Sequence, residues 1–335
     1  MSNEAEAIID RAAHATFDVA VVIPTFNRAT TILETLKSVL KQTLPVNEII
    51  IVDDCSSDET VCLVESVRSS IVRVMRNQTN VGAAESRNRG AFATKNSWIA
   101  FLDSDDVWTP DKLEQDLRAL ERNPDAIAIA SNHVAETDGG NLQPATRKER
   151  IAEPLALLKV ENYLGTCSTM TVRREALASI GGFTPFLKSC QDWDLWIRIA
   201  RRGTIAIARP GSVFYRVTSN ANISLDGKKR RAGHVFMWKT AIRPCKRDTK
   251  TRSTLALTFA DIAANLNKRR SFRRLCMYSM KSKPSNAVIA GLMLISIVGA
   301  PDYRTYRTRV VRRLGTLRAA RKVASHRLLS KRTND

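Results

Sequence analysis

The chain has 335 residues, 44% hydrophobic and 26% charged, and these near-average fractions exclude a collagen-like, low-complexity or wholly disordered protein. Residues 1–219 hold 25 Lys or Arg and 28 Asp or Glu, a net charge of −3. Residues 220–335 hold 28 Lys or Arg and 5 Asp, a net charge of +23. A near-neutral body followed by a strongly basic region favours a polyanionic partner, either acidic lipid or nucleic acid.

Strands and helices are predicted to alternate between residues 18 and 107. The predicted strands are apolar, β-branched runs at Asp18–Pro24, Glu48–Asp54, Val72–Asn77 and Ser97–Asp103. Helices are predicted between them at residues 30–42, 57–69 and 82–94, where apolar residues recur at helical spacing. Continuous apolar strands that alternate with helices indicate an α/β fold, with a mostly parallel sheet covered on both faces.

The pattern continues less regularly to about residue 219. We predict a helix at 109–122, a strand at Ala126–Ser131, a polar loop at 136–150, a strand leading into a short helix at Thr169–Leu177, a helix at Cys190–Gly203 and a strand at 204–210. Beyond Asn220 the composition changes to basic helices. The expected organisation is therefore an N-terminal extension (1–17), a main α/β domain (18–219) and a basic, mainly helical C-terminal region (220–335).

Carboxylates follow two of the predicted strands. Asp53 and Asp54 end one strand, and Asp103, Asp105 and Asp106 follow another. In parallel sheets, ligands bind at the carboxyl ends of the strands. Clustered carboxylates raise one another's pKa values unless a cation offsets them, and Mg²⁺ or Mn²⁺ binds one or two carboxylates together with substrate phosphates. The alternative is that these acids only form turns and cap helices, which suits Asp58 and Glu59 better than Asp53.

A third acidic segment is QDWDLW, in which Asp192 and Asp194 are flanked by Trp193 and Trp196. An aspartate beside aromatic rings is desolvated and becomes more basic, as a general base requires. Asp192 also suits the N-cap of a helix whose tryptophans enter the core, and the two roles are compatible.

Five motifs in this order resemble the family 2 glycosyltransferases with a GT-A fold. They are VVIPTFNRA (Val21–Ala29), IIIVDDCSSDET (Ile49–Thr60), NVGAAESRNRGAFA (Asn80–Ala93), FLDSDDVWTPDKL (Phe101–Leu113) and GGFTPFLKSCQDWDLWIRIARRG (Gly181–Gly203). The resemblance implies an inverting transfer of a sugar from a nucleotide-diphospho-sugar to a hydroxyl acceptor. By motif match it also implies that Pro24, Thr25 and Asn27 line the nucleotide pocket, that Asp53 binds the base and that Arg87 lies near the nucleotide.

The same resemblance assigns the metal site and the base. Asp103 and Asp105 form the D-x-D motif, with Asp105 as the direct ligand of Mn²⁺ or Mg²⁺ and Asp103 as a contact to the ribose or to a metal-bound water. Asp192 matches the catalytic base, although this chain has Gln191-Asp192 where the family often has Glu-Asp. The Q-x-x-R-W motif of processive synthases is absent, which favours the addition of a single sugar.

The basic region has two interpretations. In Arg304–Val323 the apolar residues approximate one helical face, and a basic amphipathic helix is typical of binding to an anionic membrane surface. The apolar run Ala287–Ala300 is too short to span a bilayer and could enter the interface. Alternatively, both segments pack on the catalytic body. With no visible signal peptide, we expect a cytoplasmic protein, peripheral at the inner face of the membrane if the first interpretation holds.

The resemblance further implies a nucleotide-sugar donor and a glycan or lipid-linked hydroxyl acceptor, in the synthesis of cell-surface polysaccharide, lipopolysaccharide or glycolipid. One rival is a nucleotidyltransferase, but no Gly-rich phosphate loop is present. The other is a non-catalytic protein that binds membrane or nucleic acid through its basic region. No nucleic-acid-binding module is recognisable, so no specific nucleic-acid partner is expected.

Overall fold

The computed structural model describes residues 17–137, 141–144, 154–158, 162–208, 213–217, 227–237 and 240. The chain divides into two compact units, Met1–Lys246 and Arg247–Asp335, and every described residue lies in the first. The apolar run and the amphipathic helix predicted in the basic region lie outside the described residues. Among the helices that the structure does describe, none is both long enough and apolar enough to cross a membrane.

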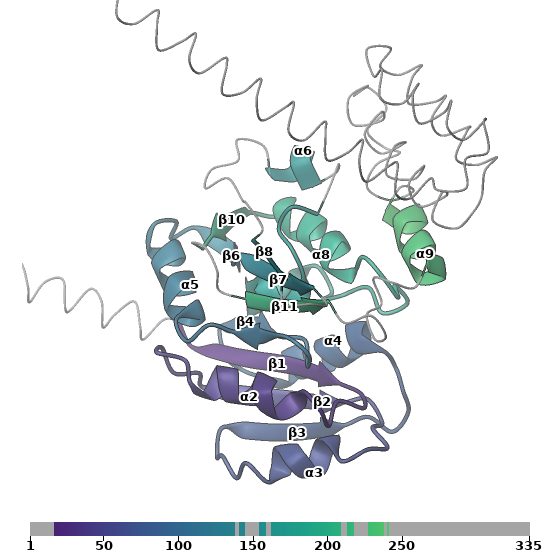
Figure 1. Cartoon of the computed structure of the whole chain (residues 1–335). Coiled ribbons are helices and arrows are strands. Elements are labelled where there is room, and N and C mark those ends of the chain that lie inside the picture. Colours follow the sequence, from purple (N-terminus) through teal and green to yellow (C-terminus); the bar gives the residue numbers. More distant parts are fainter. Residues whose placement is uncertain are drawn as a thin grey trace, which may run out of the picture. The chain divides into compact units, whose positions relative to one another are not determined.

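The main sheet has seven strands in the order β10-β6-β9-β4-β1-β2-β3 (Figure 1). Their bounds are β1 (Val19–Thr25), β2 (Glu48–Asp53), β3 (Val72–Arg76), β4 (Trp98–Phe101), β6 (Ala126–Ala130), β9 (Met170–Arg173) and β10 (Thr204–Ile207). All neighbouring strands are parallel except β9, which is antiparallel to both β4 and β6. The predicted α/β class with a mostly parallel sheet is therefore confirmed.

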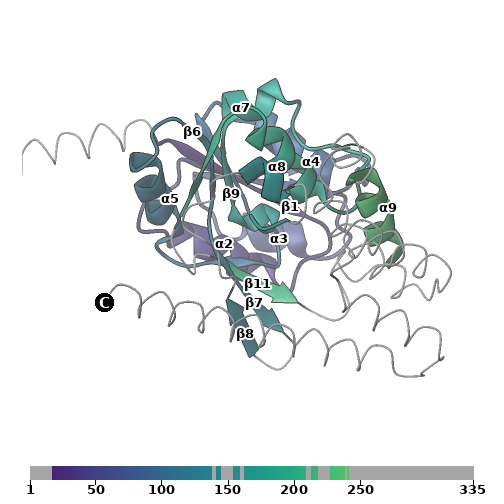
Figure 2. The same ribbon diagram turned by 90° about the horizontal axis from the view of Figure 1, so that it is seen from above.

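Helices follow most of the strands, as predicted (Figure 2). Their bounds are α2 (Ile32–Leu40), α3 (Thr60–Glu65), α4 (Ala83–Ala93), α5 (Lys112–Glu121), α6 (Pro154–Leu158), α7 (Arg174–Ser179), α8 (Gln191–Ala200) and α9 (Gly227–Met237), with a short 3₁₀ helix, η1, at Cys167–Thr169. Helix α3 is shorter than the predicted 57–69, because Asp58 accepts hydrogen bonds from the backbone and hydroxyl of Thr60 at the point where the helix begins.

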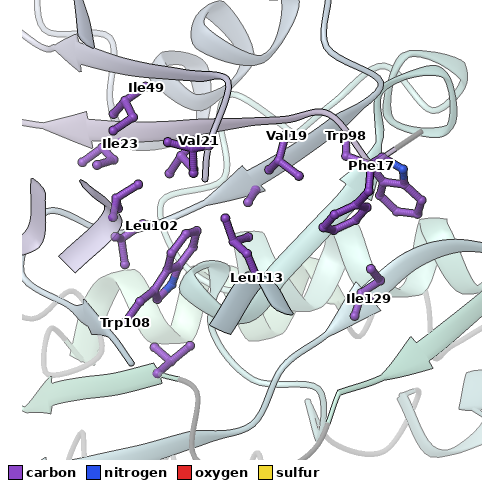
Figure 3. Packing of buried hydrophobic residues seen from close by; sticks show 14 of the residues in the cluster. Phe17, Val19, Val21, Ile23, Ile49, Trp98, Leu102, Trp108, Leu113 and Ile129 are labelled. Atoms are coloured by element: carbon purple, nitrogen blue, oxygen red, sulfur yellow. The ribbon is translucent and has the colours of Figure 1, made fainter. Parts of the chain in front are cut away.

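Both faces of the sheet are covered, which explains why all seven residues of β1 are buried. On one face, Val19, Val21 and Ile23 of β1 belong to a hydrophobic cluster that includes residues of α2, α3 and α5 (Figure 3). On the other face α4 packs so closely that a Cβ added to Gly90 would lie 2.5 Å from Val22 Cγ1. This arrangement leaves the carboxyl ends of the strands as the open edge.

A second, four-stranded sheet was not predicted. Its order is β5-β11-β7-β8, with bounds β5 (Val107–Trp108), β7 (His133–Thr137), β8 (Asn141–Pro144) and β11 (Val213–Val217). The prediction of a polar loop over 136–150 is therefore wrong at residues 136–137 and 141–144, which pair in an antiparallel ladder. Strand β11 pairs with β7 of this ladder on one side and with β5 on the other. Strand β5 comes directly after the acidic loop that follows β4.

A buried ion pair fixes the start of α5 to the sheet. Lys112 and Asp116 are both fully buried, and their charged groups are 2.7 Å apart. Lys112 Nζ also donates to Thr171 Oγ1 at 2.7 Å and lies 4.1 Å from the centre of the Trp108 ring. The Asp116 carboxylate accepts from the Ser131 hydroxyl at 2.7 Å, so the network joins α5 to β9 and to the end of β6.

Replacing Lys112 by Met should lower the free energy of unfolding by about 3 kcal/mol, because it leaves the Asp116 carboxylate buried without its cation. Urea denaturation followed by circular dichroism would measure the loss. The double variant Lys112→Met/Asp116→Leu is the control, since removing both charges should recover much of the stability. A loss below about 1 kcal/mol in the single variant would contradict this account.

Candidate active site

A cleft of about 670 Å³ opens at the carboxyl ends of β1, β2 and β4. Three kinds of segment line it: the loops that follow these strands, the N-terminal turns of α4 and α8, and residues from β11 and α9. The lining residues include Pro24, Thr25, Phe26, Arg28, Asp54, Asn80, Gly82, Arg87, Asp103, Asp105, Lys188, Gln191, Tyr215 and Lys229. The cleft therefore brings together residues from all five motifs.

The loop after β4 is held in a fixed conformation. Ser168 Oγ accepts a hydrogen bond from Asp103 N at 3.0 Å and donates one to the Asp106 carboxylate at 2.5 Å. Thr31 Oγ1 donates to Ser104 O at 2.8 Å. Asp106 is fully buried, so it anchors the loop, while Asp103 and Asp105 line the cleft.

Each of the two cleft carboxylates has an arginine partner. Arg87, which is buried in α4, forms an ion pair with Asp103, and Arg28 lies 3.5 Å from Asp105. Burial raises the pKa of Asp105, and repulsion from Asp103 raises it further, while Arg28 opposes the shift. Arg28 therefore offsets the unfavourable surroundings of the ionised Asp105 only in part.

These two carboxylates fit a hard divalent cation. Mg²⁺ and Mn²⁺ prefer oxygen ligands and take one or two carboxylates, with the rest of their shell from water and phosphate. Within the part of the chain that the structure describes, no cluster of three or more His, Cys, Asp or Glu residues could hold a metal alone. A cation here would consequently depend on substrate oxygens for the rest of its coordination.

Asp54, and not the predicted Asp53, lines the cleft. The Asp53 carboxylate faces its own loop and accepts hydrogen bonds from Ser56 N at 3.2 and 3.3 Å. The Asp54 carboxylate accepts from Val81 N and Gly82 N, both at 2.8 Å, and from Asn77 Nδ2 at 2.9 Å. Asp54 thus ties the start of α4 to the end of β2 and presents its edge to the cleft.

The residues of the first motif also differ in whether they line the cleft. Pro24 and Thr25 line the cleft, whereas Asn27 is not among the lining residues. Asn27 instead joins two loops: its backbone N–H donates to Ser56 Oγ at 2.9 Å and its side-chain carbonyl accepts from Ser57 N at 2.9 Å. Its positive φ of 50° suits this sharp turn, in a conformation that Asn adopts more readily than most residues.

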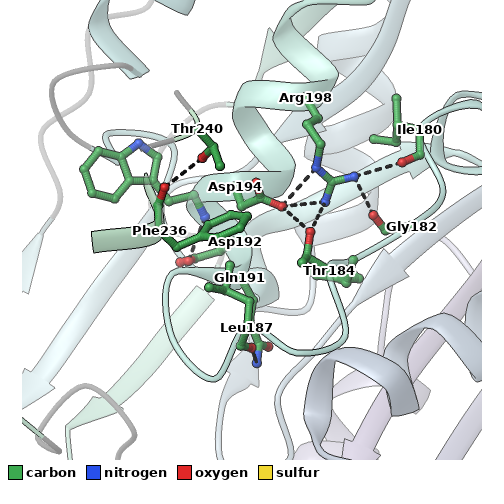
Figure 4. Close-up of polar contacts among 12 residues, drawn as sticks. Ile180, Gly182, Thr184, Leu187, Gln191, Asp192, Asp194, Arg198, Phe236 and Thr240 are labelled. Carbon is green, nitrogen blue, oxygen red and sulfur yellow. Dashed lines mark hydrogen bonds and ion pairs between the residues drawn. The ribbon is translucent and has the colours of Figure 1, made fainter. Parts of the chain in front are cut away.

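The predicted base, Asp192, lies in the first turn of α8, directly after the cleft-lining Gln191 (Figure 4). Its carboxylate accepts from Trp193 N at 2.8 Å and from Asn162 Nδ2 at 3.0 Å. Burial raises its pKa to about 6, and Asp103 contributes to the rise, while the Trp193 N–H and Arg87 act against it. At neutral pH such a group is ionised and still a competent proton acceptor.

The neighbouring acid, Asp194, has a structural role. Its carboxylate pairs with Arg198 at 2.7 Å and accepts from the Thr184 hydroxyl at 2.8 Å (Figure 4). Arg198 in turn donates to the carbonyl oxygens of Ile180 and Gly182. Asp194 therefore holds α8 against the preceding loop, which leaves Asp192 as the available base.

Arg87 connects the loop after β4 to the first residue of α8. One end of its guanidinium forms the ion pair with Asp103, and the other donates to Gln191 Oε1 at 2.6 Å. Its charge lies over the Phe183 ring, 5.4 Å from the centre. The structure thus places the loop after β4 and the start of α8 on opposite sides of one arginine, as an active site that joins them requires.

Several cleft residues were missed from the sequence. Phe26, Arg28, Asn80 and Lys188 lie within the recognised motifs, but no pattern distinguished them. Tyr215 and Lys229 follow the acidic loop after β4 by more than 100 residues, and only the tertiary fold brings them to the cleft.

Comparisons with known proteins identify relatives of this chain. Residues 20–181 match the family model described as glycosyl transferase family 2. An uncharacterized glycosyltransferase of Haemophilus influenzae is 36% identical over 187 residues, which cover 54% of this chain and 61% of the relative. The amylovoran biosynthesis glycosyltransferase AmsB of Erwinia amylovora is 30% identical over 249 residues, which cover 69% of this chain and 80% of the relative.

A solved structure shares the fold. The crystal structure of Staphylococcus aureus TarS residues 1–349 in complex with UDP-GlcNAc superposes with a TM-score of 0.56 at 18% identity, covering 87% of this chain and 90% of that one. At this identity the likeness establishes the common architecture.

Proposed function

The chain belongs to glycosyltransferase family 2, and we propose that it transfers a single sugar from a nucleotide-diphospho-sugar to a hydroxyl acceptor, with inversion. One observation carries the proposal. Arg87 links the D-x-D loop to the helix of the proposed base. Asp192 is not itself a lining residue, but it directly follows the cleft-lining Gln191 and interacts electrostatically with Arg87 and Asp103, so the acceptor-activating carboxylate adjoins the donor site. The acceptor would be a glycan or lipid-linked alcohol in the synthesis of cell-surface polysaccharide, lipopolysaccharide or glycolipid, as the name of AmsB, an amylovoran biosynthesis glycosyltransferase, suggests.

Each residue has a distinct role in this mechanism. Pro24, Thr25 and Asp54 would contact the nucleoside. Asp54 replaces Asp53 as the residue that we expect to bind the nucleobase, because it is Asp54 that lines the cleft. Asp105, with Asp103, would hold Mn²⁺ or Mg²⁺, and the cation, when bound, would supply Lewis-acid stabilisation of the diphosphate leaving group.

On the acceptor side, Asp192 would take the proton of the attacking hydroxyl. The oxygen of the acceptor hydroxyl then forms a bond to the anomeric carbon from the face opposite the leaving group, which inverts that centre. The Arg87–Gln191 contact would keep α8, and so Asp192, in place.

A donor screen tests the assignment. The protein is incubated with UDP-, GDP- and dTDP-sugars, Mn²⁺ and a mixture of hydroxyl acceptors, and the release of nucleoside diphosphate is measured. Release of a diphosphate with one donor, together with a product one sugar longer, is the expected result. Release of pyrophosphate, or a long polymer as product, would contradict the proposed reaction. Because we propose action at the cytoplasmic face of a membrane, lipid-linked acceptors belong in the mixture.

The proposed base also predicts a pH profile. Asp192 accepts a proton only when ionised, so kcat/KM should rise with pH, with an apparent pKa of about 6, and level off above it. Stopped assays of nucleotide release between pH 4.5 and 9 would measure the curve. A profile that is flat down to pH 4.5 would argue against Asp192 as the base.

A further inference from the structure

Two lysines on the cleft wall lie outside the matched segment 20–181. Lys188 belongs to the loop that leads into α8, and Lys229 belongs to α9, beyond the predicted domain boundary at residue 220. Neither lysine belongs to the D-x-D loop, and neither is the proposed catalytic base. Both are exposed residues that line the cleft.

The packing of α9 explains why Lys229 faces the cleft. Gly233, one turn further on, lies so close to the 182–190 loop that an added Cβ would be 2.6 Å from Ser189 O. The Phe236 ring contacts the Phe186 ring, with 5.5 Å between their centres. Positions i, i+4 and i+7 share one face of a helix, so the face that carries Lys229 is the face that packs on this loop. Figures 1 and 2 both show α9 beside α8.

Lys188 comes from that same loop and reaches across the cleft. Its Nζ lies 3.1 Å from the position that a Cβ on Gly82 would occupy, directly before α4. It makes no hydrogen bond or ion pair with any residue that the structure describes. The arginines of the cleft, Arg28 and Arg87, are instead paired with Asp105 and Asp103. A cation beside the positive end of a helix dipole is unfavourable unless an anion lies between them. Asp54, bonded to Gly82 N, offsets this only in part.

We propose that Lys188 and Lys229 bind the diphosphate of the donor and stabilise the nucleoside diphosphate as it leaves. This inference rests on the proposed function. As the acceptor oxygen bonds to the anomeric carbon, the bond from that carbon to the phosphate oxygen breaks, and its electron pair stays on the phosphate. The acceptor proton goes to Asp192. Ammonium groups on the cleft wall form charge-assisted hydrogen bonds to the phosphate oxygens, which become stronger as this negative charge develops.

Binding measurements separate the lysine contacts from the rest of the site. Full-length protein with Mg²⁺ is titrated with UDP, GDP and dTDP, and with the matched nucleosides uridine, guanosine and thymidine. For the diphosphate that binds, Lys188→Met and Lys229→Met should each raise Kd by about tenfold, because a charged hydrogen bond is lost. The Kd of the matched nucleoside should change less than twofold. Lys188→Arg should retain most of the diphosphate affinity, since it keeps the charge.

The control variant is Lys95→Met, an exposed lysine just past the other end of α4. It should bind every ligand as the wild type does. If the wild type binds a diphosphate and the two lysine variants bind it equally well, the inference is wrong and the proposed function stands. The same holds if they lose nucleoside and diphosphate affinity to the same extent. If the wild type binds none of the three diphosphates, the proposed function and this inference both fail.

Discussion

Asp192→Asn should lower kcat/KM by about 10³-fold while leaving donor binding unchanged, because it removes the proton acceptor and almost nothing else. The substitution preserves the size of the side chain and its hydrogen bond from Trp193 N. Nucleotide release and the binding of the nucleoside diphosphate that the wild type binds, both measured on the same preparation, would separate the loss of turnover from a loss of the site. Activity within tenfold of wild type would mean that another group takes the proton.

The same variant should be more stable than the wild type at pH 8. The pKa of Asp192 is about 6 in the folded chain and near 3.8 when unfolded, so the unfolded chain holds this proton less tightly. Ionising Asp192 therefore costs folding stability progressively as pH rises through this window, and the full cost applies above it. Asn carries no such cost. Allowing for the weakened contact with Asn162, we expect a gain of about 2 kcal/mol at pH 8.

This gain should disappear near pH 4, where Asp192 is largely protonated in the folded chain. Urea midpoints at pH 4 and pH 8 would measure the difference. Asp125→Asn is the matched control, since Asp125 is exposed. It should change neither turnover nor the pH dependence of stability. A base that costs stability and is retained would be an instance of strain kept for function.

The sequence predicted the part of the fold that depends on local pattern. Apolar β-branched runs such as Ile49–Val52 lead to strands in the main sheet, and the stripe of Ile32, Leu36 and Val39 leads to a helix that covers one face. The second sheet was missed because β5 has only two residues, and because β8 (NLQP) contains one leucine among polar residues and a proline, so neither shows an apolar run. Strands this short are stable only through pairing with segments distant in the chain.

The position of Asp54, and not Asp53, at the cleft has a related cause. Consecutive side chains of a strand point to opposite faces, so the motif alone fixes the pair Asp53-Asp54 but not which of the two faces the ligand. The register decides it: Asp53 is the last paired residue of β2, opposite Thr25 and Arg76, and its carboxylate returns to Ser56 N. Asp54 is the first residue beyond the pairing, and it reaches α4.

Asp105→Asn should reduce metal-dependent turnover by about 10³-fold, because it removes the carboxylate that we propose as the direct ligand of the cation. Arg28 is 3.5 Å from Asp105 and both side chains are partly exposed, so this pair is weak. Asp103, by contrast, is held by the buried Arg87. We therefore expect Asp105 to contribute most of the affinity for the cation, and the variant to need far more Mn²⁺ for half-maximal rate.

The arginine makes this prediction more specific. A cation that binds Asp105 competes with the Arg28 guanidinium for the same carboxylate oxygens, so Arg28→Met should lower the Mn²⁺ concentration for half-maximal rate, while Asp105→Asn raises it. Titrating Mn²⁺ at saturating donor, with Asp125→Asn as the control, distinguishes the two effects. Unchanged Mn²⁺ dependence in Asp105→Asn would place the metal elsewhere. A rise in Arg28→Met would show that the arginine assists the donor more than it competes with the cation.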